Sequence, residues 1–498
     1  MVNGGIFRGL VQLRICSVFS TVTFMQKHTN IVCTIGPASS MVPVLKDMIE
    51  AGMNIARINF SHGSHEGNLE LVEKVRDAAK QVGKEVAILQ DLQGPKMRVG
   101  TLPGEGIELI EGKLITMQAG VQTADPGVIP VPYDRFAHDL SKGDRILFAD
   151  GVREAEVVDV QGNMITAKVL LGGTLLSNKG VNVPTVTLSI DSMTEKDDED
   201  LAFGLKQNID FVALSFVRSG EDVRKLKEKI VKWTPEGVEP PQIIVKIEKH
   251  EALQNFDEIL SETDAVMVAR GDLGIETPVA KLPIHQKEII AKCVIAGKPV
   301  ITATEMMASM EYNPRPTRAE VSDVANAVID HTDAVMLSGE SAMGKYPVQV
   351  VKTMTEIIQQ TEESPLDALM PHHDTAGEPV PSAVAAAAVE LARHIGAAAI
   401  LVTTKTGFSA RQVARFRPEL PIYAATPSAR VCRQLLLSWG VSPFVIDGYG
   451  TPEKMVQDSL AKLAQDQHLP AGSKVVVMSG LTRESGSGYD SMIRVREI

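Results

Sequence analysis

The chain has 498 residues, too many for one hydrophobic core, so we expect about three domains. Hydrophobic residues make up 44% and charged residues 22%, as in a globular protein, and no window approaches the ~20 uninterrupted apolar residues that span a bilayer. The net charge of −12 argues against a nucleic-acid surface, which needs a basic stripe. Four widely spaced cysteines, Cys16, Cys33, Cys293 and Cys432, predict free thiols in a reducing compartment.

The first 26 residues differ from the rest of the chain. They contain Arg8 and Arg14 but no acidic residue, a composition that resembles a transit peptide. The alternatives are a disordered extension or an upstream start before a true Met25. We favour these alternatives and therefore expect a cytoplasmic protein.

From Ile31 onward, short runs of β-branched and apolar residues alternate with amphipathic stretches of helical length. Continuous apolar strands separated by helices predict a parallel sheet covered on both faces, and eight such units suggest a closed (β/α)8 barrel. The eight predicted strands are Ile31–Gly36, Asn54–Phe60, Val86–Asp91, Phe211–Phe216, Ile243–Ile247, Ala265–Ala269, Pro299–Ala303 and Ala334–Leu337.

The alternation of strands and helices is interrupted after the third predicted strand. From Pro95 to about Pro184, Gly-rich turns and short alternating strands predict a small β domain, inserted at the barrel rim where loops usually carry function. A linker is expected over Pro365–Pro381, then a second α/β pattern that starts with a helix over Ser382–Ile395 and ends with a strand near Lys474–Met478. The predicted domains are an extension over 1–26, the barrel over 27–94 and 185–364, a β-barrel lid over 95–184 and an α/β domain over 365–498.

Polar residues follow the predicted strands, at the end of a parallel barrel where active sites lie. Glu248 and Asp272 follow neighbouring strands and offer two oxygen ligands, a partial set that suits Mg²⁺ completed by substrate and water. Lys246, two residues before Glu248, points the same way and can stabilise charge on a phosphoryl or enolate oxygen. Gly271 lets backbone N–H groups approach an anion. The alternative is a set of unrelated, solvated rim residues.

Longer strings resemble those of pyruvate kinases, and the resemblance covers nearly the whole chain from about residue 25. The strings Pro-Arg-Pro-Thr-Arg-Ala-Glu and Met-Leu-Ser-Gly-Glu are highly specific in combination. The resemblance implies a TIM barrel with a lid and a C-terminal regulatory domain. It also implies an enzyme that acts on phosphoenolpyruvate and ADP and that usually assembles as a homotetramer. The matching segments are Asn30–Ser40, Asn54–Gly63, Gln90–Gly100, Lys246–Glu248, Val268–Gly274, Thr302–Met306, Asn313–Ala327 and Met336–Ala342.

The resemblance also implies roles for single residues. Arg57 should grip the transferring phosphoryl group, Lys246 should neutralise it and then the enolate oxygen, and Thr304 should lie where the enolate is protonated. Magnesium, or manganese in its place, should be held by Glu248 and Asp272. Two further sets are the backbone amides that bind the substrate carboxylate, at Ala269, Arg270, Gly271 and Asp272, and the nucleotide-side contacts, Asn59, His62, Arg98 and Lys196.

One stretch departs from the better-known family pattern. Many pyruvate kinases read Asp-Thr-Lys-Gly-Pro-Glu where this chain reads Asp-Leu-Gln-Gly-Pro-Lys, from Asp91 to Lys96. In the family, a monovalent cation lies beside residues that here are Asn59, Ser61 and Asp91. Leu92, Gln93 and Lys96 resemble the potassium-independent branch, so we expect the Lys96 ammonium to replace potassium. The alternative is that Lys96 swings outward and a cation binds as usual.

A loop in the last domain resembles the family's effector site. The run from Thr403 to Ser409 follows a predicted strand and opens a helix, which offers hydroxyls and backbone amides to an anion. A sugar phosphate or AMP is therefore expected at Thr404, Lys405, Thr406, Gly407 and Ser409, with Arg483 and Gly486–Gly488 closing over it. The alternative is an ordinary capped turn.

Two rival functions remain open at this point. A magnesium-dependent aldolase or lyase acting on pyruvate enolates would also pair a Glu and an Asp at strand ends, although the rim insertion and the last domain count against it. A non-enzymatic sensor of sugar phosphates would need a lost catalytic residue, and Arg57, Lys246, Glu248, Asp272 and Thr304 are all present.

Overall fold

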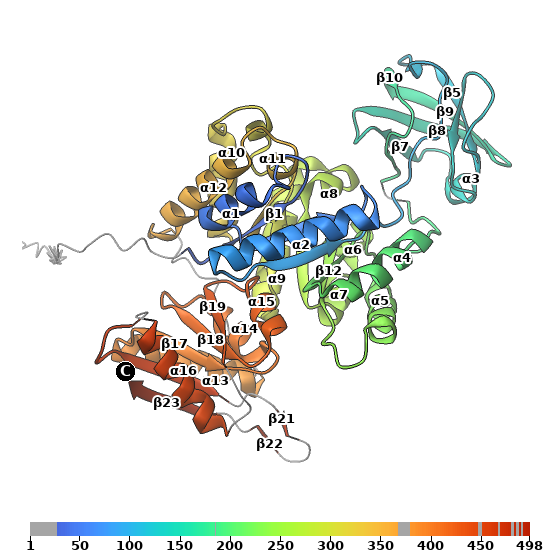
Figure 1. Ribbon diagram of the computed structural model, residues 1–498. Helices are drawn as coiled ribbons and strands as arrows, with labels where there is room; N and C mark the ends of the chain where they lie inside the picture. Colours follow the sequence, from blue (N-terminus) through green and yellow to red (C-terminus); the bar gives the residue numbers. More distant parts are fainter. Residues whose placement is uncertain are drawn as a thin grey trace, which may run out of the picture.

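The computed structural model has a central barrel, a lid region and a C-terminal α/β region (Figure 1). It describes residues 27–184, 186–366, 379–446, 451–466, 469–479, 483–484, 488–489 and 492–498. The N-terminal extension with Cys16, the Arg483 side chain and Gly486–Ser487 lie outside this description. Cys33, Cys293 and Cys432 are buried free thiols. Among the described helices, none is long and apolar enough to cross a membrane.

Eight parallel strands close into a barrel, which confirms the predicted fold. Their order is β1-β16-β15-β14-β13-β12-β3-β2. Every residue of β1, β3, β12, β14, β15 and β16 is buried, because one face fills the barrel and the other packs on the helices. The strands are β1 (Asn30–Thr34), β2 (Ile55–Asn59), β3 (Ala87–Asp91), β12 (Phe211–Leu214), β13 (Gln242–Ile247), β14 (Ala265–Ala269), β15 (Val300–Ala303) and β16 (Ala334–Leu337).

Helices surround this barrel, and several start where the sequence carries a capping signal. In α10, the Thr317 hydroxyl accepts from the Glu320 N–H, and the Glu320 carboxylate accepts from the Thr317 N–H, a capping box. The helices of this part are α1 (Val42–Ala51), α2 (His65–Val82), α4 (Glu195–Gly204), α5 (Gly220–Trp233), α6 (His250–Gln254), α7 (Phe256–Glu262), α8 (Arg270–Glu276), α9 (Leu282–Ala296), α10 (Arg318–Ile329), α11 (Gly339–Ala342) and α12 (Pro347–Glu362).

The lid region projects from the barrel between β3 and α4 (Figure 1). Its described strands form a six-stranded sheet, β11-β7-β8-β9-β5-β6, and a two-stranded sheet, β10-β4. The predicted small β domain is therefore present, but as two sheets rather than the predicted closed β barrel. A separate hydrophobic cluster with Phe136 and Phe148 at its centre fills it. Its elements are β4 (Ile107–Leu109), β5 (Leu114–Ala119), β6 (Val128–Val131), α3 (Phe136–Asp139), β7 (Arg145–Phe148), β8 (Arg153–Gln161), β9 (Met164–Leu171), β10 (Gly173–Leu175) and β11 (Val181–Asn182).

The C-terminal region is a five-stranded sheet of order β19-β18-β17-β20-β23 with helices around it. Two sequence predictions need correction here. β23 follows the predicted last strand and pairs antiparallel with it. Val380 and Pro381, assigned to the linker, lie in the first turn of α13, where proline is tolerated. The elements are α13 (Val380–Ile395), β17 (Ala399–Thr403), α14 (Phe408–Ala414), β18 (Ile422–Thr426), α15 (Ala429–Leu435), β19 (Val441–Val445), α16 (Pro452–Gln465), β20 (Lys474–Ser479), β21 (Arg483–Glu484), β22 (Gly488–Tyr489) and β23 (Met492–Glu497).

The C-terminal region docks on the amino ends of the barrel strands. Leu437 joins the cluster of inward-facing barrel residues. Arg417 pairs with Asp333, which precedes β16, and Arg433 pairs with Asp210, which precedes β12. The C-terminal region therefore covers the amino ends of the strands, and the lid region lies at their carboxyl ends.

Candidate active site

A buried cluster of charged side chains lies at the barrel mouth, where β2, β3 and β13 end. Arg57 Nε donates to Asp91 Oδ2 at 2.6 Å. Lys246 Nζ lies 2.9 Å from Glu248 Oε1 and 3.5 Å from Asp91 Oδ1. All four side chains are at most 13% exposed. The structure thus brings Arg57, Lys246 and Glu248 together around Asp91.

Neighbouring hydroxyls and one backbone amide hold these charges in place. The Thr34 hydroxyl accepts from Arg57 Nη1 at 2.8 Å and donates to the Leu337 carbonyl. The Ser215 hydroxyl accepts from Lys246 Nζ at 2.8 Å, and the Phe216 N–H donates to Glu248 Oε2 at 2.7 Å. Sequence reasoning assigned no role to Thr34, whose one signal is its place as the last residue of β1.

The cluster shifts the ionisation of its members. Burial alone would raise the pKa of Asp91, but Lys246 and Arg57 hold it below its usual value. Burial opposes the charge on Lys246, yet Asp91 and Glu248 raise its pKa above the usual value. Burial and Asp272 raise the pKa of Glu248 against the effect of Lys246. Lys246 therefore stays cationic at neutral pH.

Asp272 lies in α8, directly after β14, and its side chain is 26% exposed. It lies close enough to Glu248 to influence the pKa of that carboxyl. Two carboxylates from adjacent strands, one buried and one partly open to water and substrate, fit an octahedral divalent cation that keeps further ligands. Lys96 Nζ lies 3.4 Å from Asp272 Oδ1 and 3.9 Å from Asp150 Oδ1 in the lid region.

Thr304 follows β15 with a backbone φ of +65°, a left-handed conformation that is rare for a β-branched residue. The Thr304 hydroxyl accepts from the Gly271 N–H at 2.8 Å, so this amide is occupied by a side chain in the structure. Its carbonyl accepts from Arg270 Nη2 at 2.7 Å. The Arg270 guanidinium is buried and also donates to Asp323 in α10. It therefore holds the Thr304 backbone through the Thr304 carbonyl.

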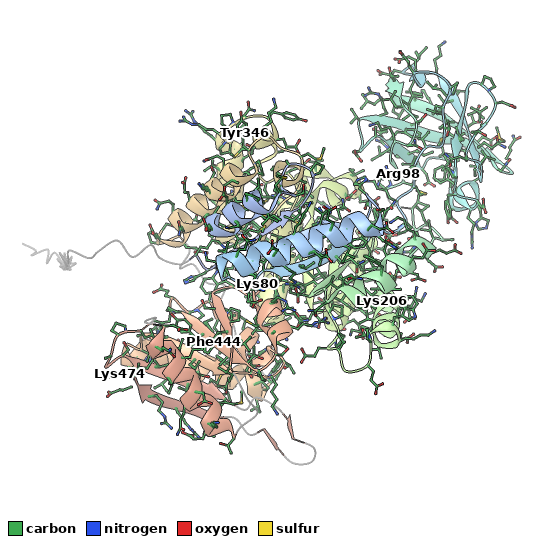
Figure 2. All side chains as sticks on the ribbon, viewed as in Figure 1. Lys80, Arg98, Lys206, Tyr346, Phe444 and Lys474 are labelled. Carbon is green, nitrogen blue, oxygen red and sulfur yellow. The ribbon has the colours of Figure 1, made fainter. Side chains whose placement is uncertain are left out.

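A cleft of about 350 Å³ lies between the rim and the lid region. Three cationic residues line it, Lys96, Arg98 and Lys196, and Figure 2 labels Arg98 where the lid region joins the barrel. Lys196 Nζ donates to Asp200 and to the Phe60 carbonyl, and Arg98 Nη1 donates to the Asn178 carbonyl. This cleft suits a polyphosphate.

The two sequence-predicted contacts at the end of β2, Asn59 and His62, are less enclosed. His62 is exposed. Asn59 Oδ1 accepts from the Ser61 N–H at 3.1 Å, which shapes the turn after β2. By contrast, Leu92, directly after β3, is 1% exposed and packs in the apolar layer between the barrel strands and the helices.

The candidate effector loop joins β17 to α14. The Thr404 hydroxyl accepts from the Gly407 N–H at 3.0 Å, and Arg411 Nη2 donates to the Thr406 carbonyl at 3.3 Å. Gly407 has a φ of +81°, and a Cβ there would lie 2.7 Å from Arg411 Nη1, so the position requires glycine. Lys405 is exposed and Ser409 is buried at the start of α14.

Comparisons with known proteins agree with this architecture. The family model described as pyruvate kinase, barrel domain, matches residues 26–351, and the one described as pyruvate kinase, alpha/beta domain, matches residues 382–496. Pyruvate kinase 2 of Synechocystis is 42% identical over 95% of this chain and 80% of its own length. Pyruvate kinase of Geobacillus stearothermophilus is 43% identical over 93% and 79%.

A solved structure extends the agreement to three dimensions. The crystal structure of a pyruvate kinase from Cryptosporidium parvum superimposes with a TM-score of 0.88 at 35% identity, over 98% of this chain and 100% of that one. Since sequence, family models and fold agree over both the barrel and the last domain, the chain belongs to the pyruvate kinase family.

Proposed function

We infer that this enzyme transfers the phosphoryl group of phosphoenolpyruvate to ADP, giving pyruvate and ATP, the last step of glycolysis. The observation that carries the inference is the buried contact of Arg57 and Lys246 with Asp91 and Glu248 at the mouth of the barrel. Phosphoryl transfer needs mainly positioning and charge neutralisation, and this cluster supplies preorganised cations for both.

In the proposed mechanism, each cation has a fixed task. Arg57, held by Asp91 and Thr34, binds the transferring phosphoryl group. Lys246, held by Ser215 and Glu248, neutralises that group in the transition state and then the enolate oxygen left behind. Because its raised pKa keeps it charged, Lys246 acts as an electrostatic stabiliser rather than as a proton donor.

Glu248 and Asp272 would hold Mg²⁺, or Mn²⁺ in its place. When bound, the ion supplies positive charge against the phosphate and carboxylate of phosphoenolpyruvate. We propose that the backbone from Ala269 to Asp272 binds that carboxylate, which would take the Gly271 N–H from the Thr304 hydroxyl. Thr304 lies on the face where the enolate takes up its proton, either directly or through an ordered water.

ADP would enter through the cleft between the rim and the lid region. Lys96, Arg98 and Lys196 line this cleft, and their side chains would donate charge-assisted hydrogen bonds to the diphosphate. Asn59 and His62 are proposed as further contacts at the end of β2. Closure of the lid would exclude water that could otherwise accept the phosphoryl group.

A coupled assay tests the reaction itself. Purified protein is mixed with phosphoenolpyruvate, ADP and Mg²⁺, and lactate dehydrogenase with NADH follows the pyruvate. ATP should appear in equal amount. Pyruvate without ATP would indicate that water accepts the phosphoryl group, and no turnover would indicate a lyase with another substrate or a binding protein.

We further propose an effector site at the loop of Thr404, Lys405, Thr406, Gly407 and Ser409. A sugar phosphate or AMP should lower the phosphoenolpyruvate concentration for half-maximal rate several-fold, within the usual range of allosteric coupling. Lys405→Met should abolish this response without changing the basal rate. Lys474→Met, the same change at an exposed lysine in β20, is the control and should leave the response intact. If sugar monophosphates, sugar bisphosphates and AMP all fail on the parent, the site is rejected.

Two further properties follow the family and are proposed for this chain. The enzyme should assemble as a homotetramer, which light scattering after size exclusion measures. We expect the enzyme to be located in the cytoplasm, because its buried Cys33, Cys293 and Cys432 are free thiols, as is usual in a reducing compartment.

A further inference from the structure

A second cluster of potential metal ligands lies at the barrel rim, outside the proposed catalytic residues. His250, Glu251 and Glu276 each offer one ligand atom, and the three atoms lie within 4.8 Å of one another. His250 Nδ1 is 3.1 Å from Glu251 Oε2 and 3.5 Å from Glu276 Oε2. The first two residues open α6 and the third ends α8.

The three atoms are buried and, apart from their close approach to one another, have no polar partner. His250 Nδ1, Glu251 Oε2 and Glu276 Oε2 all lack a contact of acceptable geometry. Glu276 is 3% exposed and Glu251 is 8% exposed. Buried carboxylate oxygens are normally paired, because an unpaired one loses its hydration without compensation. Three such atoms directed at one point indicate a cation between them.

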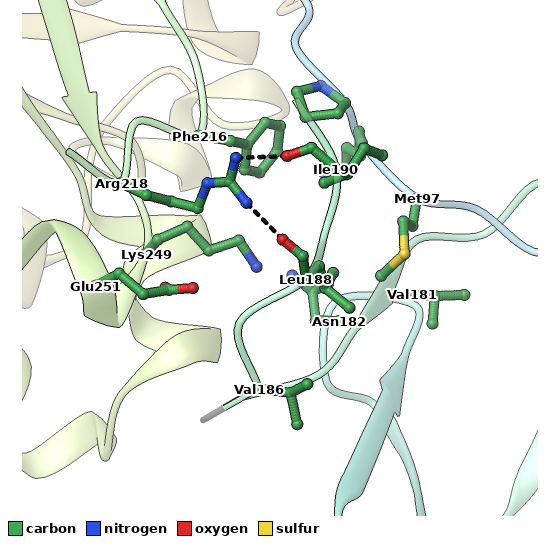
Figure 3. Close-up of a pocket in the computed structure, with 12 residues that line it drawn as sticks. Met97, Val181, Asn182, Val186, Leu188, Ile190, Phe216, Arg218, Lys249 and Glu251 are labelled. Atoms are coloured by element: carbon green, nitrogen blue, oxygen red, sulfur yellow. Dashed lines mark hydrogen bonds between the residues drawn. The ribbon is translucent and has the colours of Figure 1, made fainter. Parts of the chain in front are cut away.

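The surroundings orient the cluster as outer contacts orient metal ligands. The other oxygen of Glu276, Oε1, accepts from Lys249 Nζ at 2.6 Å and from Asn182 Nδ2 at 3.2 Å. These bonds leave Oε2 facing His250. Figure 3 shows Lys249, Glu251 and Asn182 on the wall of a cleft between the barrel and the lid region. Solvent in that cleft could complete a coordination sphere.

We propose that His250, Glu251 and Glu276 bind a divalent transition metal ion of the Zn²⁺ or Mn²⁺ type. One imidazole nitrogen and two carboxylate oxygens suit such ions, whereas Mg²⁺ takes oxygen ligands. The site is distinct from the proposed magnesium site, although Glu248 precedes His250 by two residues and Asp272 lies one helical turn before Glu276. Through Asn182 in β11, the ion would fasten the lid region to the rim.

Metal titration of the full-length protein tests the site without any substrate, so it is independent of the proposed reaction. Metal-stripped protein in excess Mg²⁺ is titrated with Zn²⁺ by calorimetry. A parallel titration with Co²⁺ reports binding and the coordination geometry by its visible absorption. We expect one Zn²⁺ per chain, and a loss of at least tenfold in affinity in both Glu251→Gln and His250→Gln.

A matched control is available on the surface. His285 Nδ1 lies 3.4 Å from Glu288 Oε2 in α9, a histidine and carboxylate pair without a second acid, so His285→Gln should bind Zn²⁺ as the parent does. Circular dichroism checks that each variant folds, and either variant alone decides the matter. No Zn²⁺ uptake, or equal uptake by parent and variants, would overturn the proposal. In that case a proton on His250 would hold the cluster together, because Glu276 and Glu251 raise the pKa of His250.

Discussion

Replacing Lys246 with methionine should lower kcat by at least about 10³-fold. Loss of one preorganised charge typically costs ~10²–10³ in rate, and Lys246 is proposed to serve both the phosphoryl transfer and the enolate that follows. Its ammonium contacts oxygens of Glu248, Asp91 and Ser215, so methionine removes the charge from a fixed position while keeping most of the side-chain volume. The coupled assay with phosphoenolpyruvate, ADP and Mg²⁺ measures the effect.

The control is Lys298→Met, because Lys298 is also partly buried but precedes β15 at the opposite end of the barrel. There its ammonium donates to the carbonyls of Leu260 and Ser261. This variant should turn over within a few-fold of the parent. Size exclusion and near-ultraviolet circular dichroism verify that both variants keep their assembly and packing. A Lys246→Met enzyme within tenfold of the parent would end the proposed role.

The barrel and the centre of its candidate site could be predicted from sequence because they depend on local patterns. Each barrel strand is a short apolar run, and a continuous apolar run is the sequence pattern of a strand that is buried on both faces. In a parallel barrel, the residues after the strands meet at one end, so Lys246, Glu248 and Asp272 could be placed together without coordinates.

Other features depend on contacts that no single segment specifies. Thr34 holds Arg57 only because β1 and β2 pair in the observed register. The left-handed Thr304 depends on Arg270, which reaches across from α8. The proposed transition-metal cluster needs the orientation of α6 against α8, since Glu276 lies far along the chain from His250. Tertiary packing, rather than propensity, decides each of these.

The potassium requirement is the property on which this chain should differ from many relatives. The Leu92 side chain is buried and carries no oxygen, and the Leu92 carbonyl already accepts from the Ser215 hydroxyl at 2.7 Å. Both oxygens of Asp91 already face Arg57 and Lys246. The ammonium of Lys96 lies at the mouth, paired with Asp272. An ammonium ~4 Å from a bound monovalent cation repels it by about 4 kcal/mol at an effective dielectric of about 20. We therefore predict that Lys96 takes over the role of potassium.

The parent enzyme should be equally active in potassium-free buffer, with tetramethylammonium holding the ionic strength, and after addition of potassium. Lys96→Glu should lose about 100-fold in kcat/KM without potassium, the usual cost of a lost catalytic charge, and should recover when potassium is added. Recovery is expected because the introduced carboxylate would stand beside Asp272 and Asp150 and attract a cation to the mouth. Lys113→Glu, the same change at an exposed lysine of the lid region, should create no such requirement. A tenfold or greater rise of the parent's activity on adding potassium would show that a cation binds as usual and that Lys96 does not replace it.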